Sequence, residues 1–396
     1  MPHSPPHQAD AALEFLCDTR FHRRLTYTTN NTRHHVSYSD YGCASSSAVV
    51  LFFGGLLGGR MAYAPLDALA KKHRIRIIHA DRPGLGGTDA VRLEERISTQ
   101  LAAIPLLLRH LGIRQVSLAA HSFGAVYAVN VLLLYPHLMH PVAPYAAFFA
   151  PWVLPRHSGV KHLQAAALLP AGMIGRFSSV ARWVNGTVAS VVHMATGVSS
   201  GGASVPVENA ATVAEQPRLD AEGLVSVQSE RSGDAMCALD LDDPGAVNGL
   251  RTLITTFLFA ENIDGAGQDA QLCLRKPRSV PWSTPGRPWA DIDDAAGQLR
   301  GIIADESHAG RRWGVDAFHA ETDAMVGERG REWFDGCWRG APTGANEDGG
   351  IAYTSQIVAG ADHDFILDPV FGASERWLER VAESFGTPAV EERSVE

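Results

Sequence analysis

Four short apolar runs in the first 150 residues constrain the fold of this chain more than any other feature. Each of the first three ends at a Gly- or Pro-rich turn, and a stretch of helical composition follows. The four runs are residues 48–53, 75–80, 116–120 and 143–150. Buried apolar strands that alternate with helices predict a mainly parallel sheet covered by helices on both faces.

Four further segments extend this sheet. Residues 25–28 and 35–39 alternate between apolar and polar side chains, as two paired strands do. The pattern of short buried strands resumes much later, at 314–319 and 355–359. The sequence therefore predicts eight strands, with a last helix at 373–385.

The strand pattern is interrupted by a long segment of different composition. Residues 154–282 contain helix-like stretches and a part rich in Gly, Ser, Ala and Asp. We therefore expect one sheet domain, formed by residues 1–153 and 283–396, with 154–282 inserted as a mostly helical lid. Residues 1–19 are expected to be a loose tail with a short helix.

Residues 115–130 predict a strand, a sharp turn and a helix, with Ser122 at the apex of the turn. Such a tight turn strains the backbone at its apex and requires small neighbours, which Ala120 and Gly124 supply. Ser199 lies in a stricter Gly-x-Ser-x-Gly match, but the Gly- and Pro-containing residues after it cannot continue as a helix. We therefore predict that Ser122 is a nucleophile.

Three stretches together resemble the α/β-hydrolase superfamily, in the branch with a cap inserted after the sixth strand. Residues 51–55 read Leu-Phe-Phe-Gly-Gly, and 80–89 are similar to the family's Asp-x-Pro-Gly-x-Gly-x-Ser loop. The third stretch is the turn around Ser122. The resemblance covers roughly residues 20–153 and 285–386, and it implies a mainly parallel eight-stranded sheet with an inserted, mostly helical cap.

The family's chain order is nucleophile, acid, base. His363 follows the last predicted strand in a Gly-rich turn, which makes it the expected base. Asp323 follows the preceding strand and resembles the family's acid, with Glu321 as the main rival and Asp316 as a weaker one. A triad imidazole needs one nitrogen toward the serine and the other held by a carboxylate.

Two backbone amides should form the oxyanion hole that stabilises the tetrahedral intermediate. We assign them to Phe123, directly after the nucleophile, and to Gly55, where glycine lets the backbone approach the substrate closely. The family usually has His where this chain has Phe53, so any hydrogen bond from that side chain is lost. The side chains expected to contact substrate are those of Phe53, Leu56, His121 and Trp152.

The composition excludes several other functions. The formal net charge is −9 and no long Lys/Arg cluster occurs, so we expect no nucleic-acid partner. The five cysteines are scattered, and no His/Cys/Asp/Glu cluster occurs at ligand spacing. We therefore expect that the protein needs neither a metal nor an organic cofactor. The sequence has no secretory signal pattern and no 18-residue apolar run, so we expect a cytoplasmic protein without a membrane span.

The serine itself limits the chemistry. Epoxide hydrolases and haloalkane dehalogenases of the family carry Asp at this turn, so Ser122 points to acyl chemistry. The leading hypothesis is hydrolysis of a carboxylic ester or related acyl bond of a lipophilic small molecule through an acyl-serine intermediate. Acyl transfer and carbon–carbon bond hydrolysis on the same triad remain open, as does a non-catalytic ligand-binding protein. The sequence specifies neither the substrate nor the oligomeric state.

Overall fold

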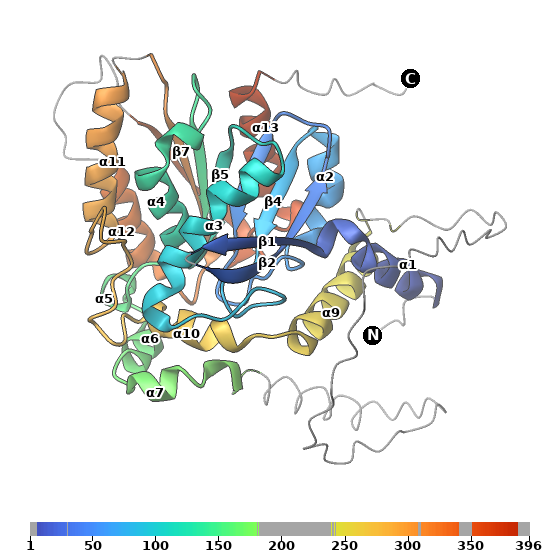
Figure 1. The fold of residues 1–396 in the computed structure, drawn as a ribbon, viewed down its shortest axis with the longest axis horizontal. Coiled ribbons are helices and arrows are strands. Elements are labelled where there is room, and N and C mark those ends of the chain that lie inside the picture. The colour runs from blue at the N-terminus through green and yellow to red at the C-terminus, as the bar shows by residue number, and fades with distance from the viewer. Residues whose placement is uncertain are drawn as a thin grey trace.

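The computed structural model describes residues 6–29, 31–179, 181, 239, 241, 243–307, 310–339 and 351–386. An eight-stranded sheet in the order β1-β2-β4-β3-β5-β6-β7-β8 runs through the molecule (Figure 1). Its strands are β1 (Arg23–Thr29), β2 (Thr32–Gly42), β3 (Val49–Phe53), β4 (Arg76–Ala80), β5 (Ser117–His121), β6 (Tyr145–Phe149), β7 (Gly314–Thr322) and β8 (Ala352–Asp362). Only β2 is antiparallel to its neighbours, and the predicted mainly parallel sheet of eight strands is confirmed.

Alternate side chains of the central strands feed two separate hydrophobic cores. On β3, Val49, Leu51 and Phe53 pack into one core, and Val50 and Phe52 pack into the other. This follows from the two-residue period of a strand, which sends successive side chains to opposite faces. A strand buried on both faces must be apolar throughout, which is why the sequence reads as a short unbroken run.

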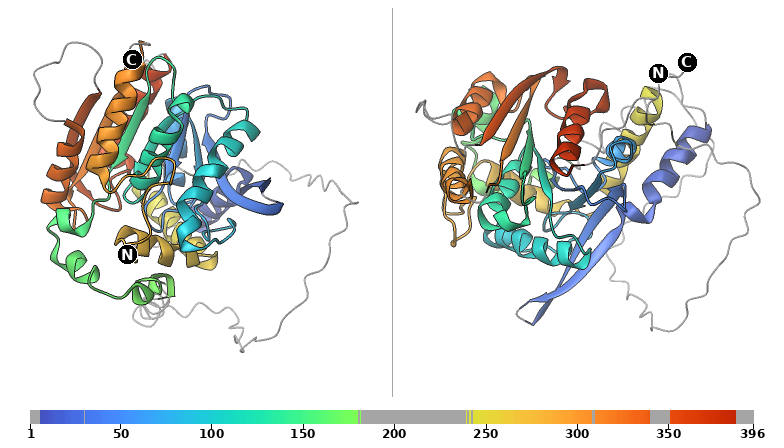
Figure 2. Two further views of the ribbon diagram at one scale, coloured as in Figure 1. Left: turned by 60° about the vertical axis from the view of Figure 1, so that its left-hand side comes forward. Right: turned by 90° about the horizontal axis from the view of Figure 1, so that it is seen from above.

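Helices cover both faces of the sheet, as the view from above shows (Figure 2). The helices α3 (Arg96–His110), α4 (Gly124–Leu134), α11 (Ile292–Ser307) and α12 (Gly327–Arg339) pack on one face. The other face is covered by α2 (Asp67–Lys72) and α13 (Ala373–Ser384). The expected last helix, 373–385, is therefore present almost to the residue.

Between β6 and β7, the chain forms six described helices, one of which is α11. The other five lie along one edge of the sheet (Figure 1). They are α5 (Pro155–Ser158), α6 (Lys161–Ala166), α7 (Ala171–Ile174), α9 (Pro244–Ala260) and α10 (Asp264–Cys273). The rival serine, Ser199, lies outside the described residues. Within the described ranges, we find no helix with the length and apolar character needed to cross a bilayer.

The N-terminal segment forms the expected short helix, but this helix is packed against the rest of the chain. Residues Pro6–Cys17 form helix α1, which packs against α9. Its Ala12 and Leu16 are buried in the same core as Leu250 of α9. The contact surface comes from a segment more than 200 residues away, so the local sequence could not indicate that this helix would be covered.

Candidate active site

Ser122 occupies the turn between β5 and α4, where the backbone is strained. Its φ angle is +52°, a left-handed conformation that non-glycine residues rarely adopt. The following helix returns so close to β3 that a Cβ atom on Gly124 would lie 2.2 Å from the carbonyl oxygen of Phe53. Only glycine fits at that position, and the fully buried Ala120 meets the same need for a small residue on the other side.

The structure brings together the three residues that the sequence analysis assigned to nucleophile, base and acid. Ser122 Oγ lies 2.9 Å from His363 Nε2, although 241 residues separate them in the chain. His363 Nδ1 lies 2.9 and 3.0 Å from the two carboxylate oxygens of Asp323. Parallel strands β5, β7 and β8 end at the same edge of the sheet, so the loops after them meet there. In this arrangement the imidazole can take the serine proton while the carboxylate fixes its orientation.

The carboxylate of Asp323 is held in its ionised form. Burial alone would raise its pKa, but the hydrogen bond and charge of His363 outweigh this and lower the pKa below its ordinary value. The backbone N–H groups of Met325 and Val326 also donate to Asp323 Oδ1, at 2.8 and 2.7 Å. Four contacts therefore fix both the charge and the position of this acid.

The two rival carboxylates contact other groups. Glu321 Oε2 accepts a hydrogen bond from the backbone N–H of Gly360 at an exposed site. Asp316 accepts one from the hydroxyl of Tyr145 at 2.7 Å, near the start of β7. Neither is within hydrogen-bonding distance of His363, so the geometry favours Asp323 as the acid.

The turn after β3 differs from the expectation for the oxyanion hole. The Gly55 N–H donates to Tyr63 Oη at 2.9 Å, so this amide already has a partner. The Leu56 N–H makes no hydrogen bond to any described atom, and Leu56 lines a cavity together with Ser122 and Phe123. The amide of Phe123 is similarly without a partner in the described part of the chain. The amides of Phe123 and Leu56 therefore have no described partner, whereas the amide of Gly55, which the sequence analysis assigned to the oxyanion hole, has one.

Comparison with solved structures agrees with this architecture. A crystal structure of DBJA matches with a TM-score of 0.51 and 13% identity, covering 91% of this chain and 98% of that one. The chain has the α/β-hydrolase fold. The resemblance predicted from the sequence is thus confirmed for the fold.

Two other solved structures were also found, with lower TM-scores. The epoxide hydrolase from Vigna radiata matches at TM-score 0.48 and 16% identity, over 93% of this chain and 99% of that one. The enol-lactonase from Burkholderia xenovorans LB400 matches at 0.48 and 11%, over 91% and 100%. No protein-family model and no curated protein sequence matches the chain significantly.

In this α/β-hydrolase fold, His121 links the turn after β3 to the loop that carries His363. His121 Nε2 lies 2.8 Å from the carbonyl oxygen of His363, and His121 Nδ1 lies 2.8 Å from Tyr63 Oη. A carbonyl oxygen can only accept, so Nε2 carries the proton and Nδ1 accepts from the Tyr63 hydroxyl. Burial, together with the neighbouring His363, lowers the pKa of His121 to about 3, which keeps the ring neutral.

Ser122 opens on an apolar cavity of about 280 Å³. Leu56 and Trp152 line it, as expected from the sequence, but Phe53 is buried in the core and His121 points to Tyr63 and His363. Other lining side chains come from the helices between β6 and β7, and they include Leu163, Met173, Ile174, Ala270 and Cys273. None of the described lining residues carries a charge.

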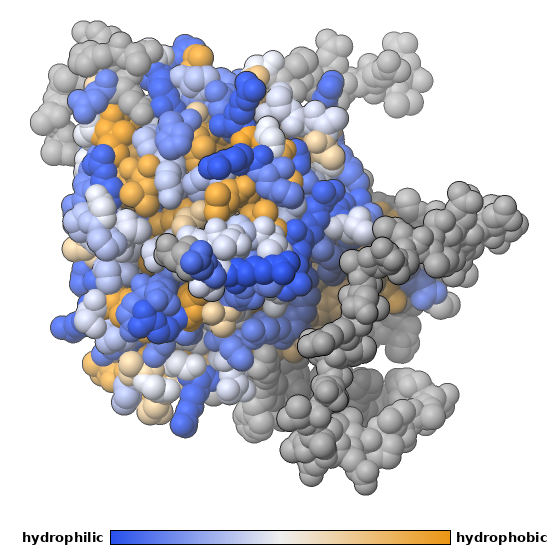
Figure 3. Space-filling model, in the orientation of Figure 1, coloured by the Kyte–Doolittle hydropathy of each residue, from blue (hydrophilic) through white to orange (hydrophobic). Residues whose placement is uncertain are grey.

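The outer rim of this cavity is apolar as well. Leu169 and Met173 line the cavity while 40% and 58% exposed, and neighbouring Leu168 is 83% exposed. In the space-filling view, apolar atoms lie among polar ones over α6 and α7 at the lower left (Figure 3). Within the described ranges, no three His, Cys, Asp or Glu side chains are gathered where they could hold a metal ion.

Proposed function

We propose that this chain is a serine hydrolase that cleaves a carboxylic ester, or a related acyl bond, of a lipophilic small molecule. One observation carries the proposal: Ser122 Oγ lies 2.9 Å from His363 Nε2, and Ser122 lines an uncharged cavity. A serine hydroxyl is a weak nucleophile unless a base removes its proton during attack.

The reaction proceeds in two halves on these groups. His363 takes the Ser122 proton as Oγ attacks the substrate carbonyl, and the amides of Phe123 and Leu56 bind the oxyanion. Asp323 stabilises the imidazolium, which then gives its proton to the departing alcohol as the acyl-serine forms. A water molecule attacks the acyl carbon, His363 accepts its proton and returns it to Ser122, and the carboxylic acid leaves.

The cavity indicates what kind of group enters. A charged group there would lose its hydration without gaining a partner, because no described lining residue is charged. A volume of about 280 Å³ corresponds to about nine water molecules at their liquid volume of roughly 30 Å³ each, so the cavity holds a small acyl group. The favoured substrates are therefore neutral esters with a medium-length aliphatic or a single-ring aromatic group.

We also propose that residues 154–282 act as a cap on a core formed by 1–153 and 283–396. Helices α6, α7 and α10 supply most of the cavity wall that does not come from the sheet domain. A wall from inserted helices excludes water from the serine and gives the site its size limit.

Labelling with a fluorophosphonate probe tests the proposed function. Wild-type protein should be labelled and should hydrolyse 4-nitrophenyl butyrate, and Ser122→Ala should lose both properties. Ser374→Ala is a matched control, because Ser374 is equally buried but lies on α13, away from the cavity. If Ser122→Ala retains labelling and hydrolysis, the assignment of the nucleophile is wrong. If wild-type protein is not labelled but binds neutral esters, the chain is a ligand-binding protein.

A further inference from the structure

One buried arginine holds the backbone of the turn that carries the oxyanion donor. Arg82 Nη1 donates to the carbonyl oxygen of Gly54 at 2.6 Å. Its Nη2 donates to the carbonyl oxygens of Gly55 and Leu56, at 2.5 and 3.0 Å. A single guanidinium thus binds three successive carbonyl groups, and only 2% of its side chain is exposed.

These contacts determine where the neighbouring N–H groups point. In a trans peptide unit the carbonyl and the following N–H point in opposite directions. Arg82 and the backbone N–H of Gly58, which donates to the same oxygen at 2.8 Å, together hold the Gly55 carbonyl to one side, so the Leu56 N–H of that peptide unit is directed to the other side. Rotation of this unit by half a turn would present a carbonyl oxygen where an oxyanion donor is needed.

The position of Arg82 depends in turn on a residue between β6 and β7. Asp269, on helix α10, is fully buried, and its Oδ2 accepts from Arg82 Nε at 2.7 Å. Its Oδ1 accepts from Arg96 Nε at 2.9 Å and from the Tyr127 hydroxyl at 3.1 Å. A buried guanidinium is strongly destabilising without a carboxylate partner, so Asp269 both neutralises and orients Arg82.

We propose that Asp269 is a positioning residue for catalysis, which acts through Arg82 to aim the Leu56 amide at the oxyanion. The inference rests on the proposed function. Docking of α10 and formation of the oxyanion hole are then coupled, because the Arg82 guanidinium takes part in both. The turn at residues 54–56 is therefore held in place by a helix that also lines the cavity.

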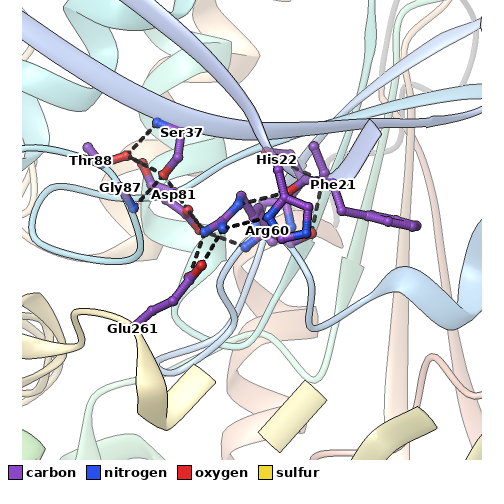
Figure 4. Close-up of polar contacts among 10 residues, drawn as sticks. Phe21, His22, Ser37, Arg60, Asp81, Gly87, Thr88 and Glu261 are labelled. Carbon is purple, nitrogen blue, oxygen red and sulfur yellow. Dashed lines mark hydrogen bonds and ion pairs between the residues drawn. The ribbon is translucent and has the colours of Figure 1, made fainter. Parts of the chain in front are cut away.

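A second buried arginine provides a comparison within the same molecule. Arg60 binds Glu261, at the end of α9, and also the Asp81 carboxylate and the Phe21 carbonyl oxygen (Figure 4). The Arg60 Nη1 atom lies 2.7 Å from Glu261 Oε2. This ion pair also ties the inserted helices to the sheet domain, but the Arg60 side chain makes no described hydrogen bond to residues 54–56. Loss of the Glu261 charge should therefore weaken the docking of α9 without rotating the peptide unit between Gly55 and Leu56.

The test compares Asp269→Asn with Glu261→Gln, using the hydrolysis of 4-nitrophenyl butyrate. One oxyanion donor contributes roughly 10²–10³ in rate, so a misaligned donor in Asp269→Asn should lower kcat by about 10- to 100-fold. KM should change less than about 3-fold, and a trifluoromethyl ketone, which forms an oxyanion on the serine, should bind more weakly by a factor like that in kcat. Glu261→Gln should keep kcat within about 2-fold of wild type.

Arg82→Lys provides a second variant in case Asp269→Asn fails to fold. Lysine keeps the charge beside Asp269 but lacks the planar fork that reaches three carbonyl groups, so the same loss of kcat is expected. If the folded Asp269→Asn and Arg82→Lys proteins lose no more kcat than Glu261→Gln does, the positioning role is overturned, while Ser122-dependent hydrolysis by wild type leaves the proposed function intact. Absence of Ser122-dependent hydrolysis in wild type would instead overturn both.

Discussion

Two parts of the segment between β6 and β7, helices α6 and α7 and helices α9 and α10, make different kinds of contact with the rest of the molecule. Helices α6 and α7 contribute Leu163, Met173 and Ile174, whose contacts are apolar. Helices α9 and α10 are tied to the sheet domain by two ion pairs, that of the partly exposed Glu261 and that of the fully buried Asp269. Apolar contacts are non-directional and tolerate small shifts, whereas charged hydrogen bonds require a defined geometry. We therefore expect α6 and α7 to govern which substrates bind, and α10 to govern how fast they react.

The largest effects should come from neither part, because the reacting groups lie on the sheet domain. His363→Ala should reduce kcat by several orders of magnitude, as removal of a triad member typically does. Asp323→Asn should cost about 10⁴-fold, because the carboxylate that orients the imidazole and stabilises its positive charge is lost.

Steady-state hydrolysis of 4-nitrophenyl butyrate measures these losses, with Glu321→Gln as the matched control. Glu321 is two residues from Asp323, but its described contact is to the Gly360 amide, so this variant should keep near wild-type activity. The assignment of the acid is wrong if Glu321→Gln is the crippling change and Asp323→Asn is mild.

A charge introduced at the rim of the cavity tests whether α6 and α7 govern substrate binding. Met173→Glu places a carboxylate beside the apolar lining, which should raise KM for a six-carbon acyl ester by about 10-fold while kcat changes less. Met173 is 58% exposed, so the protein should still fold.

Leu168→Glu is the control for this change, because Leu168 is more exposed and does not line the cavity. Equal KM values for the two variants would show that α7 has no part in substrate binding. A fall in kcat at Met173→Glu as large as that at Asp269→Asn would remove the distinction between the two parts.

Low pH should lower the stability of the folded protein through two buried histidines. His121 and His79 are buried, and burial is the main cause that lowers the pKa of each to about 3. Below about pH 6.5 the unfolded chain takes up two protons that the folded protein does not bind. The free energy of unfolding should therefore fall with decreasing pH between about 6.5 and 3, by about 1.4 kcal/mol per pH unit for each histidine.

Urea unfolding at pH 7.5, 6 and 5 measures this slope. His121→Gln removes one of the two groups and should roughly halve the slope, even if the variant is less stable at every pH. His35→Gln is the control, since His35 is partly exposed on β2. An unchanged slope in His121→Gln would show that His121 does not stay neutral in the folded protein.

Local sequence patterns were sufficient to predict the sheet and to single out the three residues that the structure brings together. Strand runs are short and apolar because both faces are buried, and Ser122 is marked by the small residues that its turn requires. Asp323 and His363 could be found because each follows a strand that ends at the same edge. These signals lie within about ten residues of each group.

The contacts that hold the turn at residues 54–56 could not be predicted from local patterns. Arg82 and Asp269 are 187 residues apart, and no periodic pattern relates them. The proposed choice of Leu56 over Gly55 as oxyanion donor depends on the hydrogen bonds of this turn, in which Tyr63 accepts from the Gly55 N–H and both Arg82 and Gly58 donate to the Gly55 carbonyl. The available signal was the pair Asp81-Arg82 directly after an apolar strand, since charged residues in such a place must find buried partners.

The ion pair between Arg82 and Asp269 also bears on how such proteins can be recombined. Exchange of the lid between relatives is an obvious route to new substrate range. A transplanted lid that lacks a carboxylate at the position of Asp269 would leave two buried arginines, Arg82 and Arg96, without the counter-ion that they share. Such a chimera would show a well-formed binding pocket with little turnover, and restoring the single acidic side chain would be the first step in repairing it.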